Sequence, residues 1–205
     1  MTVHTRVWCL RHAESENVTA GLAGAVSAAP LTERGHQQAV AAASELAGEP
    51  ITRVYASTAA RAVQTAEPLA ATARVDVVVL PELVEVGVGE YEGMTAPAVH
   101  RRTAEVLHAW VVENDLGQQV ADGETGHQVL DRMTTAFRHI ADTHRGQTVA
   151  LVGHVASLTL ALSWLCGLGS QVWGTPLPHA VPFLVELDSR GWRCVAWPGS
   201  TVSRT

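Results

Sequence analysis

Short apolar runs alternate along the chain with longer segments in which alanine and other apolar residues recur at helical spacing. The apolar runs are rich in β-branched residues and suit strands; they lie at 6–10, 51–56, 75–80, 147–153 and 181–187. The alanine-rich segments have the length of helices, at 33–47, 58–73, 126–144 and 155–166. This alternation predicts an α/β three-layer sandwich, in which a mostly parallel central sheet carries helices on both faces.

End signals support the first predicted helix. Thr32 stands at the N-cap position, and Glu33 follows in the first turn, where an acidic residue suits the helix dipole. Gly48 and Pro50 are typical of the residues that follow a helix end. We therefore expect this helix to begin after Thr32.

The segment at about 81–125 interrupts the alternation. It is rich in acids and glycines, and it contains an amphipathic stretch at 96–114, with Val99, Val106 and Trp110 at helical spacing. We expect the 205 residues to form a single domain with a small cap-like insertion here, folded over the carboxyl edge of the sheet. The apolar positions of the insertion are interpreted as core and cap packing.

Composition excludes several function classes. The formal net charge is −6 and no basic cluster is present, which argues against a nucleic-acid partner. No apolar stretch is long enough to span a bilayer, and the first residues lack a signal-peptide core, so we expect a cytoplasmic protein without a membrane partner. The three cysteines, Cys9, Cys166 and Cys194, show no CxxC spacing and suggest buried reduced thiols. All 14 fixed side-chain cations are arginines, which excludes lysine-dependent chemistry.

Chemically suited side chains follow four of the predicted strands. Arg11 and His12 follow the first strand, Arg61 the second, Glu85 the third and His154 the fourth. Open α/β sheets build their sites at the carboxyl ends of parallel strands, so these residues are expected to meet at one edge. Two arginines, two histidines and an acid suit a site that binds a phosphate dianion and attacks it.

The motifs around these residues resemble those of the histidine phosphatase superfamily, which contains cofactor-dependent phosphoglycerate mutases and many small-molecule phosphatases. The matching segments run in the order of the family's motifs: Leu10–Ser15 with Asn17, Pro30–Ala39, Arg61–Ala66, Leu83–Gly93, Gly123–Thr125 and Gly153–His154. This order extends from residue 7 to about residue 165, so the resemblance covers most of the chain.

The resemblance implies a role for each catalytic residue. His12 would be the nucleophile that forms a phosphohistidine, and Arg11, Arg61 and His154 would bind the phosphoryl oxygens. Glu85 would protonate the leaving group and then accept a proton from water. This chemistry requires neither a metal nor a cofactor. A zinc site shared by His12 and His154 would lack a third ligand at a recognisable spacing.

Three further residues are assigned to substrate binding. Ser15 and Asn17 would supply neutral hydrogen bonds around the phosphate, and the backbone N–H of Val155 would reach it. Val155 stands where the family usually has glycine, and Ala13 also replaces a commoner glycine. Because a β-branched side chain narrows the approach, these departures would tune specificity or weaken catalysis.

Some assignments have alternatives. Glu82 is the runner-up to Glu85, which is preferred because its L-x-E register resembles the family. His127 and His179 would line the pocket or have purely structural roles. Exposure of Trp164, Trp173 or Trp192 would indicate a surface for a homodimer.

The leading hypothesis is a phosphomonoesterase that acts on a small phosphorylated metabolite, because the insertion favours a small-molecule pocket. One alternative is a phosphoglycerate-type mutase, although Val86-Gly87-Val88 follow the acid where such mutases have an arginine and a tyrosine. Another is a catalytically weak regulatory or binding member of the fold, although all five catalytic residues are present.

Overall fold

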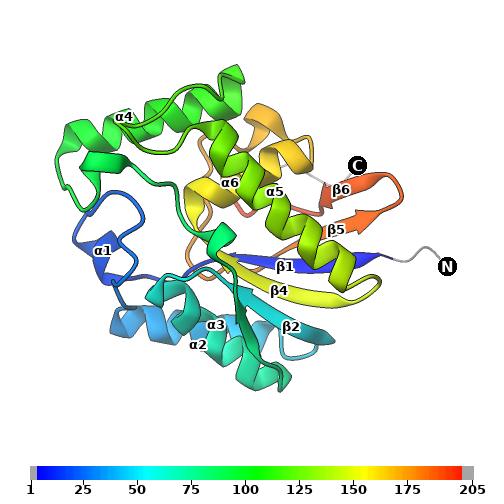
Figure 1. The fold of residues 1–205 in the computed structure, drawn as a ribbon. Coiled ribbons are helices and arrows are strands. Elements are labelled where there is room, and N and C mark those ends of the chain that lie inside the picture. The colour runs from blue at the N-terminus through cyan, green and yellow to red at the C-terminus, as the bar shows by residue number, and fades with distance from the viewer. Residues whose placement is uncertain (1–3, 200–205) are drawn as a thin grey trace.

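The computed structural model describes residues 4–199, so the ends of the expected domain, residues 1–3 and 200–205, lie outside it. Its centre is a six-stranded sheet of order β3-β2-β4-β1-β5-β6 (Figure 1). The strands are β1 (Thr5–Arg11), β2 (Ile51–Ala56), β3 (Val77–Val79), β4 (Thr148–Gly153), β5 (Phe183–Asp188) and β6 (Gly191–Cys194). Strands β1 to β4 run parallel, which confirms the expected mostly parallel sheet.

The antiparallel edge of the sheet is where the structure adds most to the sequence pattern. β5 occupies the position predicted at 181–187, but it runs antiparallel to β1. β6, a short strand not predicted from the sequence, pairs antiparallel with β5. Its residues, Gly-Trp-Arg-Cys, have no run of apolar side chains, so periodicity does not reveal it.

Helices cover both faces of the sheet, as expected for a three-layer sandwich (Figure 1). On one face lie α2 (Glu33–Glu45) and α3 (Ala60–Ala73), and on the other lie α5 (Gly126–Thr143) and α6 (Val155–Leu165). The predicted start of α2 is confirmed, because the Thr32 hydroxyl accepts a hydrogen bond from the Gly35 N–H at 3.0 Å.

The two faces are packed differently. The cluster beneath α2 and α3 is built largely of alanines such as Ala39, Ala62 and Ala66. The cluster beneath α5 and α6 contains larger side chains, including Phe137 and Leu158. Small side chains allow helices to approach the sheet closely, so the first turn of α3 lies directly beside the ends of the central strands.

The insertion lies at the end of the sheet where β1 ends, together with the short helix α1 (Glu16–Thr19) (Figure 1). It comprises η1 (Pro81–Leu83), η2 (Gly89–Tyr91), α4 (Pro97–His108) and the π-helical turn η3 (Ala109–Glu113). Val99, Val106 and Trp110 are buried, in agreement with the packing role expected for them. Within residues 4–199, no helix combines the length and apolarity required to cross a bilayer.

The side chains proposed as markers of a dimer surface have mixed exposure. Trp164 and Trp173 are exposed, whereas Trp192 is half-buried. The homodimer therefore stays a prediction. Of the cysteines, Cys9 is buried and the other two are half-buried, and all three are free thiols.

Candidate active site

The pairing of β1 with β4 brings two histidines together at the sheet edge. Arg11 is in register with Gly153, and the His12 N–H continues the ladder by donating to the Gly153 carbonyl at 2.9 Å. His12 and His154 thus follow adjacent parallel strands, and their ring centroids are 5.1 Å apart. Both side chains are buried, so their chemistry is set by the protein groups around them.

His12 has the protonation pattern of a nitrogen nucleophile. Its Nδ1–H donates to the Ala13 carbonyl at 2.7 Å, which leaves the lone pair on Nε2. Arg61 Nε–H donates to that Nε2 at 3.2 Å. Burial, followed by the charge of Arg61, holds the pKa of His12 well below its ordinary value, so the ring is neutral at pH 7. A neutral imidazole with one unprotonated nitrogen can attack phosphorus.

Arg61 links the two histidines from the first turn of α3. Besides its bond to His12, its Nη2 lies 3.3 Å from His154 Nδ1. The same guanidinium donates to the carbonyls of Ala25 and Val26, at 2.7 and 2.8 Å. Arg61 is buried, so its position is fixed on every side, and its charge is directed at the gap between the rings.

His154 is held by a residue that the sequence analysis did not single out. Its Nε2 lies 2.6 Å from the hydroxyl of Ser57, the first residue after β2. Burial, followed by the nearby His12 and Arg61, lowers the pKa of His154 well below its ordinary value. Nδ1 then accepts from Arg61 and Nε2–H donates to Ser57. The position of Ser57 directly after a strand was the signal available in the sequence.

His127 and His179, whose roles the sequence left open, lie in different places. His179 Nδ1–H donates to the His12 carbonyl at 2.9 Å, and the two rings are 5.5 Å apart. Burial, followed by the charge of Arg11, lowers the pKa of His179. His179 therefore holds the backbone of His12, whereas His127 is exposed, and neither histidine lines the cavity described below.

Arg11 presents an unsatisfied donor at the site. Its Nη1–H donates to the Leu177 carbonyl at 3.0 Å, while its buried Nε–H has no partner among residues 4–199. Burial lowers the pKa of Arg11, but a guanidinium remains charged at any physiological pH. A buried, charged N–H without an acceptor suits an anionic ligand.

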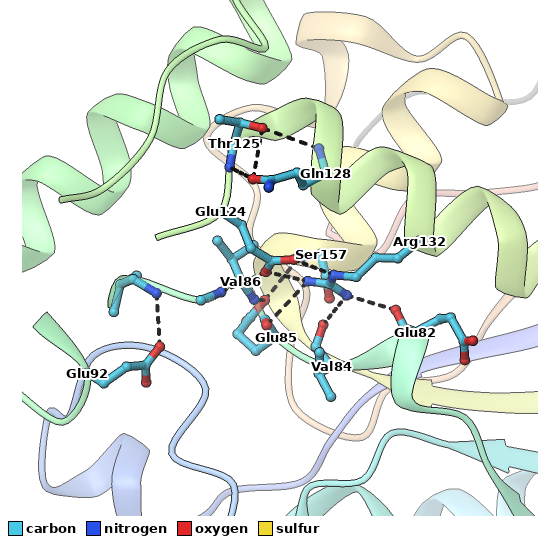
Figure 2. A network of polar contacts seen from close by, with 12 residues as sticks. Glu82, Val84, Glu85, Val86, Glu92, Glu124, Thr125, Gln128, Arg132 and Ser157 are labelled. Carbon is cyan, nitrogen blue, oxygen red and sulfur yellow. Dashed lines mark hydrogen bonds and ion pairs between the residues drawn. The ribbon is translucent and has the colours of Figure 1, made fainter. Parts of the chain in front are cut away.

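Glu85 lies at the N-terminus of α6, facing the same cavity. Its carboxylate accepts from the N–H groups of Val86 (3.0 Å), Ser157 (3.0 Å) and Ala156 (3.2 Å). Together with Arg11, His12 and Arg61 it lines a cavity of about 350 Å³. Glu82, the alternative acid, does not line this cavity, and its carboxylate points away from the network in Figure 2. The structure therefore places Glu85, and not Glu82, in the cavity that His12 lines.

A half-buried arginine holds the segment that carries Glu85. Arg132 of α5 donates through Nη1 to the carbonyls of Glu82 and Val84, at 2.8 and 2.7 Å, and through Nη2 to that of Glu85, at 3.3 Å (Figure 2). Its Nε and Nη2 also form a fork with Glu124, at 2.7 and 2.9 Å. We call Arg132 and Glu124 the acid clamp, because they fix the backbone on both sides of Glu85.

Glu124 of the acid clamp also binds the backbone just after Glu85. Oε2 of Glu124 accepts from the Gly87 N–H at 2.9 Å. Burial tends to raise the pKa of Glu124, but the hydrogen bonds from Arg132 and Gly87 and the charge of Arg132 outweigh it, so the pKa is lowered. Gly123 allows this approach, since a Cβ there would collide with the Gly87 carbonyl. Arg132 was missed in the sequence, where its only signal is a position eight residues after Glu124.

Glu92 ties the loop beside Arg61 to the insertion. Its carboxylate accepts from the N–H groups of Ala25 and Val88, at 2.8 and 2.9 Å. Gly24 has φ +85°, and a side chain there would occupy the space of the Glu92 carboxylate. The loop carbonyls that hold Arg61 are thus themselves held by Glu92.

Of the three predicted substrate-binding residues, two line the cavity and one does not. Asn17 and Val155 line the cavity, and Val155 is the first residue of α6. Ser15 does not line the cavity; its hydroxyl donates to Asn17 Oδ1 at 2.7 Å and so orients the amide. Residues 4–199 contain no group of three histidine, cysteine, aspartate or glutamate side chains placed to hold a metal ion.

Comparisons with known proteins identify relatives of this chain. The chain is 27% identical over 182 residues to phosphoserine phosphatase 1 of Hydrogenobacter thermophilus, covering 88% of this chain and 86% of that protein. It is 31% identical over 170 residues to the adenosylcobalamin/alpha-ribazole phosphatase of Salmonella typhimurium, covering 82% and 83%. A protein of Photorhabdus laumondii named probable phosphoglycerate mutase is 28% identical over 163 residues, covering 80% of this chain and 75% of that protein.

The fold also matches solved structures. A mycobacterial glucosyl-3-phosphoglycerate phosphatase superposes with a TM-score of 0.80 at 22% identity, covering 94% of this chain and 98% of that one. The sequence profile of the histidine phosphatase superfamily (branch 1) matches residues 7–199. The chain therefore belongs to the histidine phosphatase superfamily.

Proposed function

We propose that this protein is a phosphomonoesterase that hydrolyses a small phosphorylated metabolite through a phosphohistidine on His12. The observation that carries the proposal is the state of His12: Nδ1–H is fixed on the Ala13 carbonyl, and Nε2 lies beside Arg61. An unprotonated nitrogen whose lone pair accepts only a hydrogen bond from a fixed guanidinium suits attack on a phosphoryl group that the guanidinium has bound.

In the first step His12 Nε2 attacks phosphorus and the bond from phosphorus to the ester oxygen breaks. Arg11 and Arg61 bind the phosphoryl oxygens and neutralise the charge that spreads over them in the transition state. A phosphoryl dianion beside His154 favours its protonated form, in which Nδ1–H donates to an oxygen. The arginines supply the charge stabilisation that other phosphatases obtain from a metal ion, so the proposed reaction is metal-independent.

Glu85 would act in both steps. It gives its proton to the departing alkoxide, then takes one from the water that attacks the phosphohistidine and releases inorganic phosphate. The acid clamp supports this role, since it fixes the segment that carries the carboxylate. Asn17, oriented by Ser15, and the backbone N–H of Val155 would complete the contacts to the phosphoryl group.

The proposal is tested by phosphate release from p-nitrophenyl phosphate and from a panel of phosphorylated metabolites. We expect His12→Ala to abolish release and the exposed His36→Ala to leave it unchanged. Wild-type protein quenched during turnover should carry a phosphoryl group that is stable in base and labile in acid, as expected for phosphohistidine.

Other results would overturn the proposal in defined ways. Isomerisation of 3-phosphoglycerate without net phosphate release would establish the mutase alternative. A chain that neither turns over any ester nor becomes phosphorylated would be a binding member of the family. Release that persists in His12→Ala would exclude His12 as the nucleophile.

A further inference from the structure

We propose, on the basis of the phosphatase function above, that the substrate's leaving group is an uncharged, largely apolar alcohol that also carries a hydrogen-bond donor. The inference rests on the part of the active-site cavity that lies beyond the phosphoryl-binding residues. This part is formed by the loop after α1, by the insertion and by the first turn of α6.

Most of this region is apolar. Its wall comprises aliphatic side chains from three separate elements of the fold: Val18 and Leu22 near α1, Val86, Val88 and Leu107 in the insertion, and Val155 in α6. We call these six residues the apolar wall. Val18 is exposed, and Leu22, Leu107 and Val155 are only half-buried, so the wall keeps apolar surface available to a ligand.

Charge is confined to the phosphoryl end of the cavity. Across residues 4–199, the lining includes no arginine other than Arg11 and Arg61 and no acid other than Glu85. The nearest arginines of the insertion do not face the wall: Arg102 donates to Gln118 and to the Gln119 carbonyl, and it lines a different hollow together with Arg101. A carboxylate on the leaving group would therefore lose water without gaining a cation, which is strongly unfavourable.

The two polar side chains of α4 that line the cavity, His100 and Thr103, are arranged to accept hydrogen bonds. His100 Nε2–H donates to the Gly21 carbonyl at 2.9 Å, so Nδ1 is the ring nitrogen left to accept a hydrogen bond. The Thr103 hydroxyl donates to the Val99 carbonyl at 2.9 Å, so its oxygen has lone pairs to offer. Both therefore suit a hydroxyl or N–H group on the substrate. Asn17, the one amide side chain of the lining within residues 4–199, belongs to the set proposed for the phosphoryl group.

The position of the wall is set by bonds between the loop and the insertion. The Ala23 N–H donates to the Met94 carbonyl and the Gly93 N–H to the Ala23 carbonyl, both at 2.9 Å. With Glu92 and His100, these contacts hold the two halves of the wall at a fixed separation. The cavity, at about 350 Å³, accommodates a small leaving group of this kind.

The test uses three alkyl esters that differ in the leaving group but share a primary alkoxide: 3-phosphoglycerate, glycerol 1-phosphate and 4-(hydroxymethyl)benzyl phosphate. We expect kcat/KM to rise at least ~10-fold from the first to the second, and again to the third. An apolar gain of this size is reasonable, because each buried methylene contributes roughly fourfold in affinity.

A matched pair of variants shows whether the wall is responsible. Ala104→Arg places a cation on the exposed face of α4 that borders the cavity, and Ala98→Arg places one on the same helix outside the lining. We expect only Ala104→Arg to improve turnover of the charged ester, so that kcat/KM with 3-phosphoglycerate rises ~10-fold relative to kcat/KM with glycerol 1-phosphate.

The outcomes distinguish this inference from the function on which it rests. Phosphate release with 3-phosphoglycerate as good a substrate as the neutral esters would overturn the inference and leave the phosphatase intact. An equal response to Ala104→Arg and Ala98→Arg would also overturn it. No release from any ester would overturn the phosphatase function, and the inference with it.

Discussion

The two ends of the active-site cavity are built on different principles. At the phosphoryl end, His12 and His154 follow adjacent strands and are fixed by a continuous set of charged and neutral hydrogen bonds. At the leaving-group end, the walls come from loops and α4, and aliphatic side chains dominate. The reaction is therefore specified by the sheet edge, whereas the choice of substrate depends on segments that can change without disturbing that edge.

Glu85 lies at the boundary between the two ends, and its removal is expected to have the largest effect. We expect Glu85→Gln to lower kcat/KM for an alkyl phosphate ester by roughly 10² to 10⁴-fold, the usual range for a general acid. The loss with p-nitrophenyl phosphate should be much smaller, because p-nitrophenolate leaves without a proton. Initial rates with the two substrates measure the difference.

Glu82→Gln is the matched control for that experiment. Its carboxylate lies outside the cavity, so both substrates should be turned over at close to the wild-type rate. A loss equal to that of Glu85→Gln would show that the proton transfer had been assigned to the wrong acid.

The second-largest effect is expected from loss of the acid clamp, because the clamp joins the insertion to the α5 face of the sheet. Arg132→Met removes hydrogen bonds to three carbonyls and to Glu124, so we expect a loss of about 2–3 kcal/mol in the free energy of unfolding, typical of bonds to a charged group. Misplacement of Glu85 should lower kcat for alkyl esters by roughly 10-fold while KM changes little.

Arg145→Met, at an exposed arginine paired with Asp142, is the control and should change neither quantity. The leaving-group dependence shows whether the acid clamp acts through Glu85. If Arg132→Met slowed alkyl and p-nitrophenyl esters equally, the clamp would support the fold alone and would not be a positioning device.

The lowered pKa of His154, at the phosphoryl end, predicts a smaller effect on stability that depends on pH. The pKa of His154 is lowered in the folded chain, chiefly by burial. At a pH below the ordinary pKa of histidine, His154 therefore binds a proton in the unfolded chain but not in the folded chain. The stabilising effect of His154 is thus complete above about pH 6.5 and is lost as the pH falls toward the lowered value. The slope is up to about 1.4 kcal/mol per pH unit.

Denaturant unfolding at pH 7.5, 6.5 and 5.5 measures this slope. His154→Gln should reduce the slope, to which His12 and His179 also contribute, and the exposed His36→Gln should leave it unchanged. An unchanged slope in His154→Gln would show that the imidazole is protonated in the folded chain.

The smallest effect is expected at Val155, where the two ends of the cavity meet. Val155→Gly should cost less than about 1 kcal/mol of stability, because Val155 is the first residue of α6 and the penalty for glycine applies to a helix interior. Removal of the valine side chain widens the cavity beside the phosphoryl group, so kcat/KM for a bulky ester should rise a few-fold. The value of kcat/KM for p-nitrophenyl phosphate should change by no more than about twofold. Paired kinetics on the two esters measure the change; a large loss on both would indicate that the valine contributes to catalysis itself.

The residues of the phosphoryl end were predictable because they follow strands, and strand ends can be read from an apolar run followed by charge. Arg11, His12, Arg61 and His154 all have this signal. Arg132 does not, because it binds main-chain carbonyls, which every residue type offers. His100 was likewise assigned no role, since its contact is a carbonyl of a loop distant in sequence.

The fold shows the same division. The parallel strands and the four large helices were readable from periodicity, and their positions are confirmed. The direction of β5 and the existence of β6 depend on a tight turn at Asp188–Gly191 and on pairing between short, partly polar strands. Such pairing is decided by neighbouring strands and leaves little pattern in the sequence itself.

The bond from Arg61 Nε–H to His12 Nε2 has a consequence for selectivity. It occupies the lone pair that attack requires, so the resting nucleophile is masked by a hydrogen bond. A phosphoryl dianion competes for the guanidinium and releases the nitrogen, whereas an uncharged electrophile such as an acylating reagent has no charge with which to do so. We therefore expect the resting enzyme to resist accidental acylation at His12 and to expose its reactive atom only to an anion that Arg61 can bind.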